Sequence, residues 1–400
     1  MQDWTDGPRS NLTQAEVEQS VSWDGGARFS WGVEAYDLAT GSPKSLSVEF
    51  IDGSVDWSYR VPNSVTGRAD LEASVRRTAT LNAVGDILPD VFNTLFKIYL
   101  EMSSGKSKTS KWYLGTFVAT LPPFNFDGQL RRWTLELADK THYWDQRKIN
   151  DPKSIITNQH ALLYVQTVLF DVFQEGLFDF PNENRFLDEP LFVEKNTSYL
   201  EIFNLVLEAT GFEPLTTNPD GLAKTRVAED FFSVPIEHLY STEQNSTILE
   251  QVSVDPLLAN APNVLRFVAR RGPSLPVEGN GIYTIFNLNV GPGSINNRGY
   301  EIPETVEVEA NNQTELERIA VRDANRFFMG GGERVSITTG INPRHDDRDV
   351  VALYYPEIGL DSFETKWAVT SWMIPLSSEI SSENDVTMSI EAEKLWTPGG

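Results

Sequence analysis

The chain has 400 residues, of which 33 are basic and 57 acidic, so its formal net charge at pH 7 is −24. It has no cysteine, which excludes disulfides, thiolate metal sites and a cysteine nucleophile, and its four histidines are too widely spaced for a His-rich metal site. No apolar run approaches the roughly 20 residues of a membrane span, and the N-terminal segment lacks the basic and apolar blocks of a signal peptide.

Length and charge also limit the organisation and the partners of the chain. Its length exceeds the roughly 250–300 residues that one hydrophobic core supports, so several domains are expected. The acidic surface disfavours nucleic-acid binding, because such binding needs cations that displace the counterions of the phosphates. The excess of acid fits simple solubility, or a surface that DNA passes without adhering, and charge alone does not choose between them.

The first part of the chain is predicted to be an N-terminal arm followed by β-strands. Residues 1–27 are polar and lack a clear period. The strands that follow show the period of two that half-buried strands have, and segment 71–83 keeps one apolar phase that only Arg77 breaks. An inward arginine indicates either a bulge or rim position, or a salt bridge at a subunit contact, and we favour the bulge or rim.

Two similar hairpins are predicted far apart in the chain. The first, at 111–144, follows a linker at 103–110 whose composition predicts flexibility. The second is at 366–396, where Pro375 is expected to end the first strand. Both copies run Lys-Trp, strand, Pro-containing turn, strand and closing Trp. Two ordinary hairpins can resemble each other by chance; the alternative, which we adopt, is a pair of related β-domains in one chain.

Helical periodicity appears in two regions. Between residues 150 and 226 one helix is predicted over 158–173, and a second begins at Ser198, which forms a capping box with Glu201. The clearest helix of the chain follows Thr314, which forms a capping box with Glu317.

These patterns predict a mainly β chain with an α+β insert. The apolar period changes from two to that of a helix at about residue 150, and returns to two after about residue 226. The predicted domains are, in order, an N-terminal arm (1–27), a first β-domain (28–149), a small α+β insert domain (150–226), a β-rich connecting region (227–305) and a second β-domain with one packed helix (306–400).

No catalytic, cofactor-binding or metal-binding residue is predicted. The sequence lacks the usual nucleophile, zinc and nucleotide motifs, and its Gly-rich loop at 291–299 does not match a phosphate-binding pattern. The densest acidic cluster, Asp346, Asp347 and Asp349 beside His345, offers ligands for a hard cation, but we favour a polar turn that ends at a strand. Tryptophans in phase within strands are more often core or interface than a sugar-binding platform.

The order of these segments resembles that of the baseplate hub, or minor tail protein, of long-tailed bacteriophages with non-contractile tails. That family is related in fold to the baseplate hub of contractile-tailed phages. The resemblance runs from about residue 50 to residue 396 and is carried by four segments: VRRTATLNAV with the two strands after it, the segment ending LELADKTHYWDQRKI, the segment TSYLEIFNLVLEATGFEPLTTNPDG, and the helix after Thr314 with NPRHDDRDVVALYY and the final hairpin.

The resemblance implies a particular architecture. Two tail-tube-like β-domains, each a barrel or sandwich, would be joined by smaller insert domains. A homotrimer would then present six similar domains in a ring that matches the six-fold tail tube. The chain stops soon after the second hairpin, so no appended lytic or fibre-like domain is expected.

The function expected from this resemblance is structural, and no enzymatic activity or cofactor is expected. The chain would be a virion component of the tail tip, assembled in the host cytoplasm. It would close the tail tube, line the channel for DNA ejection, and dock the distal tail protein, the tape-measure protein and receptor-binding or fibre proteins. Double-stranded DNA would pass through the lumen without specific binding.

Two further expectations complete the analysis. The hairpin strands near Trp112 and Trp367 are expected to pack between subunits or domains. The alternative function is a carbohydrate-binding or cell-wall-degrading tail protein, which would use a carboxylate pair on a β-scaffold beside exposed tryptophans.

Overall fold

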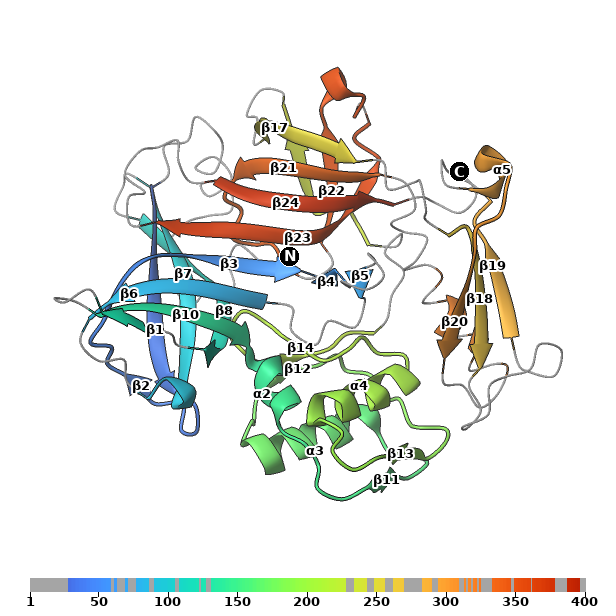
Figure 1. Cartoon of the computed structure of the whole chain (residues 1–400), viewed down its shortest axis with the longest axis horizontal. Helices are drawn as coiled ribbons and strands as arrows, with labels where there is room; N and C mark the ends of the chain where they lie inside the picture. Colours follow the sequence, from blue (N-terminus) through green and yellow to red (C-terminus); the bar gives the residue numbers. More distant parts are fainter. Residues whose placement is uncertain are drawn as a thin grey trace. The chain divides into compact units, whose positions relative to one another are not determined.

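A computed structural model gives the fold of the chain (Figure 1). It describes residues 28–58, 61–62, 69–70, 77–85, 90–104, 108–121, 124–126, 131–227, 234–242, 248–255, 262–269, 283–289, 294–308, 313, 316–317, 319–321, 324, 333–346, 349–360, 362–377 and 387–395. The chain divides into two compact units. Unit 1 is Met1–Ala228, Thr339–Asp347 and Ser371–Ser389, and unit 2 is Glu229–Thr338, Arg348–Thr370 and Ile390–Gly400.

Unit 1 is built on a mainly antiparallel sheet. Its strands pair in the order β23, β3, β6, β10, β8, β7, β1, β2, with β9 added to β10. Their bounds are β1 (Arg28–Asp37), β2 (Pro43–Lys44), β3 (Glu49–Ser58), β6 (Arg77–Val84), β7 (Thr94–Ser104), β8 (Lys108–Leu121), β9 (Phe124–Phe126), β10 (Arg131–Asp139) and β23 (Lys366–Ser377), of which residues 371–377 pair with β3. The short strands β4 (Val61–Pro62) and β5 (Ala69–Asp70) pair with each other, and a 3₁₀ turn, η1 (Val91–Asn93), precedes β7.

Alternate residues of these strands form the core of the sheet, as the period of two predicts. In β6 the buried residues Ala79, Leu81 and Ala83 alternate with residues that are exposed or partly buried. Trp57 of β3 is stacked against Trp372 of β23, with ring centroids 6.5 Å apart. The mainly β class predicted from sequence is confirmed.

The sheet of unit 1 curls strongly. Five strands separate β1 from β23 in the pairing order, yet Trp31 Nε1 of β1 donates to the carbonyl oxygen of Ser377 at the end of β23 (3.1 Å). Among the described residues no ladder joins β1 to β23 and none closes the sheet into a barrel. The predicted barrel or sandwich is therefore realised as a curled sheet whose ends meet through a side chain.

The α+β insert also belongs to unit 1 (Figure 1). Its elements are α2 (Lys140–Gln146), β11 (Lys153–Ile155), α3 (Ala161–Phe173), β12 (Phe178–Asp179), β13 (Leu191–Val193), α4 (Tyr199–Ala209), β14 (Thr216–Thr217) and β15 (Ala223–Lys224). Ser198 caps α4 by accepting a hydrogen bond from the Glu201 N–H, so the predicted cap is confirmed. The apolar faces of all three helices share one core.

Unit 2 contains a larger and a smaller group of strands. In the larger group β16 (His238–Ser241) lies parallel to β22 (Val350–Tyr354), and β22 is antiparallel to residues 366–368. The strands β17 (Ile248–Asp255), β21 (Arg334–Gly340) and β24 (Thr387–Lys394) are neighbours in that order; residues 334–338 of β21 and 390–394 of β24 belong to unit 2. In the smaller group β18 (Val264–Ala269) lies between β19 (Tyr283–Asn287) and β20 (Pro303–Val308). Two short turns of helix are α5 (Ile295–Arg298) and η3 (Pro356–Ile358).

The predicted helix after residue 314 is partly described. Residues 313, 316–317, 319–321 and 324 are helical, and Leu316, Ile319, Ala320 and Ala324 pack with β18 in one core. Thr314 lies outside the described residues, as does the predicted N-terminal arm. Within the part of the chain that is described, no helix is long and apolar enough to span a membrane.

Three expectations about local structure are wrong. Residues 103–104 and 108–110 are not part of a linker, because they belong to the paired strands β7 and β8, in which Ser103 pairs with Thr109. Pro375 does not end β23, which continues to Ser377; proline fits a strand position where its missing N–H is not needed. The segment after Asp139 turns into α2 and does not remain extended.

The predicted domain boundaries remain predictions. The two hairpins both form as strands, since β8 pairs with β10 and β23 neighbours β24. Compactness, however, groups Ser371–Ser389 with unit 1 and the rest of the second hairpin with unit 2. The boundary between the units therefore passes through strands of the predicted second β-domain.

A tight turn of the insert packs directly on the sheet of unit 1. Gly221 has a φ of +82°, and a Cβ there would lie 2.7 Å from Thr116 Cβ. Thr116 Oγ1 of β8 donates to the Pro219 carbonyl oxygen (3.0 Å), and Lys140 Nζ donates to the Gly221 carbonyl oxygen (3.0 Å). Only glycine combines this left-handed backbone with so close an approach.

Gly221→Ala tests this contact. We expect a loss of unfolding free energy of about 1–2 kcal/mol from the left-handed backbone, and a further loss of about 1–3 kcal/mol from the overpacked contact with Thr116. Gly41→Ala is the matched control, because Gly41 has a φ of +66° but nothing within 4 Å of the added methyl group. Urea unfolding of both variants measures the difference, and equal losses would contradict the close approach.

Candidate functional site

Arg77 opens β6 and is buried inside unit 1, with 2% of its surface exposed. Its backbone N–H donates to Asp139 Oδ2 (3.0 Å), and its guanidinium donates to the Thr217 carbonyl oxygen (3.4 Å) and to Asp346 Oδ1 (2.7 Å). It pairs with Trp57 in the β3–β6 ladder. Arg77 therefore points inward in phase with its strand. The bulge or rim position that we favoured is wrong, and the salt bridge lies within the chain.

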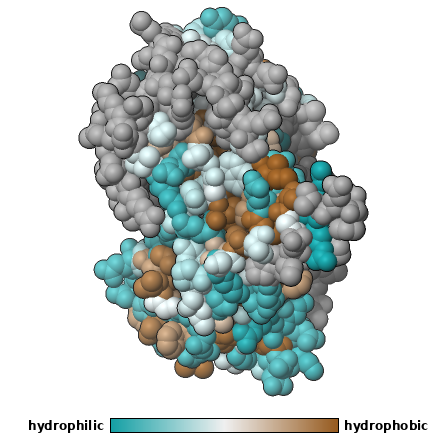
Figure 2. Space-filling model, turned by 90° about the vertical axis from the view of Figure 1, so that its left-hand side faces the viewer, coloured by the Kyte–Doolittle hydropathy of each residue, from teal (hydrophilic) through white to brown (hydrophobic). Residues whose placement is uncertain are grey.

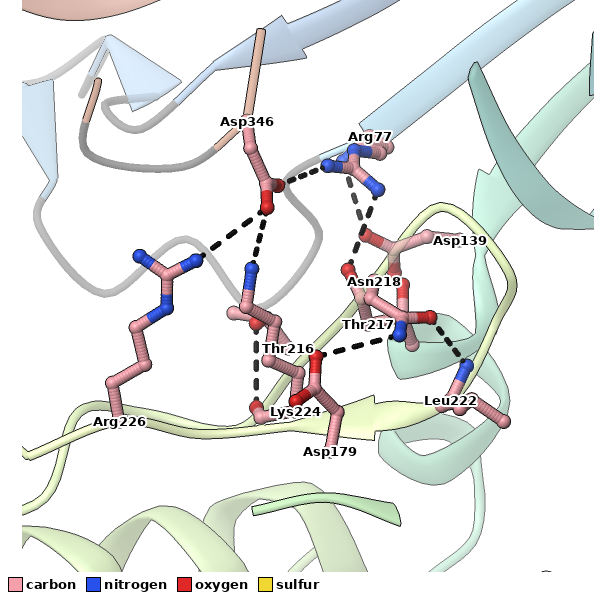
Figure 3. A network of polar contacts seen from close by, with 10 residues as sticks. All are labelled: Arg77, Asp139, Asp179, Thr216, Thr217, Asn218, Leu222, Lys224, Arg226 and Asp346. Atoms are coloured by element: carbon pink, nitrogen blue, oxygen red, sulfur yellow. Dashed lines mark hydrogen bonds and ion pairs between the residues drawn. The ribbon is translucent and has the colours of Figure 1, made fainter. Parts of the chain in front are cut away.

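Asp346 is the carboxylate on which three cationic side chains converge (Figure 3). Arg77 Nη2 lies 2.7 Å from Oδ1, while Lys224 Nζ and Arg226 Nη2 lie 2.6 and 3.5 Å from Oδ2. The side chains of Arg77, Lys224 and Asp346 are almost completely buried, whereas that of Arg226 is 41% exposed. We call these four residues the Asp346 cluster.

Burial makes the Asp346 cluster sensitive to the loss of any one charge. Moving an ion out of water costs several kcal/mol, and only a partner charge and hydrogen bonds in good geometry offset that cost. Asp346 lies 269 positions from Arg77 and 122 positions from Lys224 in the sequence. The cluster therefore fixes the sheet, the insert and segment 339–347 to one another inside unit 1.

Asp139 connects the cluster to the start of the insert. It lies at the end of β10, is 1% exposed, and caps α2 by accepting a hydrogen bond from the Thr141 N–H (3.0 Å). Its other oxygen accepts the Arg77 N–H. Burial raises the pKa of Asp139 above its usual value, although the donors from Thr141 and Arg77 act in the opposite direction.

A second polar cluster lies on strands β1, β7 and β8. Glu34 pairs with Lys111 and accepts hydrogen bonds from the hydroxyl groups of Tyr36 (2.8 Å) and Tyr113 (3.1 Å). Lys111 Nζ also lies 3.5 Å from the centroid of the Tyr99 ring. Burial raises the pKa of Glu34, but the hydrogen bonds from Lys111 and the tyrosines outweigh it, so the pKa lies below its usual value.

The acidic turn that offered ligands for a cation does not form a metal site in the described residues. Asp346 is occupied by cationic partners, and His345 and Asp349 are buried. No group of three or more histidine, aspartate and glutamate side chains converges as metal ligands in the part of the chain that is described. Asp347 lies outside that part. In the described part of the turn Asp346 belongs to a buried ion cluster, and the polar turn that we favoured stays a prediction.

Tryptophans are mainly core residues in this chain. Trp57, Trp144 and Trp367 are at most 1% exposed, and Trp112 is 3% exposed. The side chains of Trp112 and Trp367 are thus buried within the chain, and the expectation that the hairpin strands near them pack between subunits or domains stays a prediction. The alternative function required exposed tryptophans beside a carboxylate pair, and no described tryptophan is exposed.

Sequence reasoning found two members of the Asp346 cluster and missed the other two. Arg77 stood out because it breaks an apolar phase, and Asp346 stood out in an acidic turn. Lys224 and Arg226 were given no role. Their spacing of two residues carried the missing signal, because in an extended segment it places both cations on one side of the backbone.

Two solved structures of tail proteins have a similar fold. The structure of the tail protein from Neisseria meningitidis MC58 matches with a TM-score of 0.60 at 14% sequence identity, over 92% of this chain and 98% of that chain. The 43 kDa tail protein of prophage MuSo2 from Shewanella oneidensis matches with a TM-score of 0.58 at 12% identity, over the same shares of the two chains. The chain has the fold of these tail proteins.

A further solved structure has a similar fold. A chain of the Francisella PdpA–VgrG complex matches with a TM-score of 0.52 at 11% identity, over 92% of this chain and 53% of that chain. No protein-family model and no curated protein matches the sequence. The resemblance to phage tail proteins inferred from the order of segments is confirmed at the level of fold.

Asp346→Ala tests the buried cluster. We expect a loss of unfolding free energy of about 3–5 kcal/mol, because the substitution leaves Arg77 and Lys224 buried without their counterion. Asp220→Ala is the control, because Asp220 is 58% exposed and lies 3.8 Å from Lys97; such a surface pair contributes about 0–1 kcal/mol.

Urea unfolding monitored by tryptophan fluorescence measures both variants. Adding Arg77→Met to Asp346→Ala should recover part of the loss, because it removes one uncompensated cation. Equal stabilities of Asp346→Ala and Asp220→Ala would contradict the role given to the cluster.

The second polar cluster, in which Glu34 contacts Lys111, Tyr36 and Tyr113, predicts a pH dependence of stability. The pKa of Glu34 is lower in the folded chain than the ordinary value of 4.5, so its stabilising contribution is present above pH 4.5 and is lost as the pH falls through the folded pKa. Wild-type chain should therefore be more stable than Glu34→Gln at pH 7, and the difference should shrink below pH 4.5. Unfolding at pH 7, 5, 4 and 3 measures it, and a difference that grows on acidification would contradict the assignment.

Proposed function

We propose that the chain is a structural component of a phage-type tail. The observation that carries the proposal is the match in fold over 92% of this chain and 98% of the chain of a tail protein, with a TM-score of 0.60. A match over nearly the full length of both chains includes the β-sheets and the insert, and is not limited to one common motif. Fold alone does not define function, so the proposal also needs support from the residues.

The residues support a mechanical role. The Asp346 cluster holds the insert of unit 1 at a fixed place on the curled sheet, in a site that water and salt reach poorly. The turn at Gly221 adds a second point of attachment. A component that transmits force within an assembly needs such rigid attachment between its parts, whereas these charges are buried and are not presented to a substrate.

The finer part of the proposal concerns the place of the chain in the tail. We propose a homotrimeric hub at the distal end, which closes the tube and docks the distal tail, tape-measure and receptor-binding or fibre proteins. Its place would be the virion tail tip. The net charge of −24 supports a lumen that repels the phosphate backbone, so that DNA passes during ejection without binding.

The proposal includes the absence of catalysis. The carboxylate that stood out in the sequence, Asp346, is neutralised by buried cations and is not placed to act on a ligand. The described tryptophans contribute to the core or are partly buried, so they do not form a sugar-binding platform. These observations favour a structural role over the alternative of a cell-wall-degrading protein.

Particle mass tests the proposed hub. Light scattering of the purified chain should give 134.7 kDa, three times the chain mass of 44.9 kDa, and negative-stain images should show a ring. A monomer under all conditions, including mixing with a distal tail protein, would contradict the trimeric hub. Hydrolysis of purified cell wall by the chain, abolished by a single Asp or Glu substitution, would contradict the absence of catalysis.

A further inference from the structure

The insert of unit 1 carries large apolar side chains on its surface. Six of its residues are at least half exposed, and they come from the loops, from the β11–β13 ribbon and from α3: Ile156, Leu163, Phe170, Leu177, Phe186 and Phe192. Brown, apolar side chains are also visible among hydrophilic ones on the face shown in Figure 2. Single exposed apolar residues are ordinary, but a concentration of them within one small domain marks an interaction surface.

Three of these residues form a stripe along α3, which we call the α3 stripe. Leu163 and Phe170 are 55% and 60% exposed and are seven residues apart, so they lie on one face of the helix about 10 Å apart. Phe186, 50% exposed, extends the stripe at the start of α3, because its ring contacts the ring of His160 at 5.2 Å. The His160 Nδ1 in turn accepts the Leu163 N–H (3.2 Å).

The opposite face of α3 is buried against the rest of the insert. Leu162, Val165, Leu169 and Phe173 are buried in the core that α3 shares with α4. The exposed face also carries the polar residues Thr167 and Asp171, so α3 is amphipathic, and Leu163 and Phe170 are large apolar side chains on its solvent face. The core of the chain does not explain why these two positions are apolar.

Exposed carboxylates lie beside the α3 stripe in the sequence. Asp171 follows Phe170 directly, and Glu183, Asp188 and Glu189 flank Phe186 within three residues. All four side chains are exposed. Among the described residues of the insert the exposed lysines are Lys148, Lys153 and Lys195, all outside these segments. Arg185, next to Phe186, is partly buried and lies 4.0 Å from Glu183, so one of the four carboxylates already has a cation beside it.

The four exposed carboxylates beside the stripe, which we call its acidic rim, indicate the charge of the partner. A second copy placed on the same stripe would set like carboxylates against each other, and like charges across an interface disfavour association. A segment with lysine or arginine around its apolar face would instead gain from every carboxylate of the rim. Leu163 and Phe170 are seven residues apart, which is two helical turns, and an amphipathic helix presents apolar anchors at a matching interval.

We propose that the α3 stripe is a docking site for a basic amphipathic helix of another protein. The helix would lie along α3, cover Leu163, Phe170 and Phe186 with its apolar face, and place its cations over Asp171 and Asp188. The proposal follows from the surface chemistry of the insert and stands whether or not the chain closes a tail tube.

A peptide panel tests the proposal with the full-length chain. The probes are a fluorescein-labelled helical peptide with a leucine face and lysines elsewhere, the same peptide with glutamate in place of lysine, and a basic peptide whose scrambled order destroys the apolar face. Fluorescence anisotropy should show the basic amphipathic peptide binding at least tenfold more tightly than either of the others. Its affinity should fall as the salt concentration rises.

Two double variants and a control locate the site. Leu163→Ser with Phe170→Ser should weaken binding at least tenfold, because the anchors are lost, and Asp171→Asn with Asp188→Asn should weaken binding and flatten its salt dependence. Phe92→Ser is the matched control, because Phe92 is 61% exposed on η1, outside the insert. Circular dichroism melts verify that all the variants are folded.

Three outcomes would overturn the proposal. The first is equal binding of the basic and acidic peptides, and the second is unchanged binding by the Leu163→Ser, Phe170→Ser variant. The third is a fall in the particle mass of that variant, because the stripe would then be an interface between copies of this chain. Loss of peptide binding with an unchanged particle mass supports the docking site and leaves the oligomeric state as a separate question for light scattering.

Discussion

The buried attachment of Arg77 to Asp346 is the constraint on which unit 1 depends. It joins a strand near the start of the chain to a segment near its end, and Lys224 brings in the insert at the same carboxylate. Because each ion relies on the others to offset its desolvation, the three segments cannot be separated without exposing or stranding a charge. Apolar packing supplies most of the stability of such a sheet, while the ion cluster specifies which segments meet.

The insert consequently has two chemically different sides. One side is fixed to the sheet by charge and by the close approach at Gly221. Another carries the α3 stripe, where apolar side chains face solvent among carboxylates. A domain that is rigidly attached on one side and has a binding surface on another suits an adaptor within a larger assembly. This agrees with the structural role proposed for the whole chain.

Local patterns predicted much of this fold, and long-range contacts explain the rest. The phase of β6 and the cap at Ser198 were readable because they depend on residues a few positions apart. The partner of Arg77 was not readable, because nothing in a local period indicates a carboxylate 269 positions away. Pro375 and segment 103–110 were misassigned for a related reason: pairing with neighbouring strands overrode the local preference of proline and of a polar linker.

The discontinuity of unit 1 has a consequence for synthesis. Its sheet needs residues 371–377 to cover the edge of β3, and its buried cations need Asp346. A growing chain folds from its N-terminus as it leaves the ribosome, at about 5–20 residues per second. Arg77 and Lys224 thus emerge well before their counterion, and the sheet is completed only when residues 371–377 have been made. A product that terminates before residue 371 lacks the closing strand, so completion of the sheet distinguishes chains that contain this segment from shorter fragments before assembly.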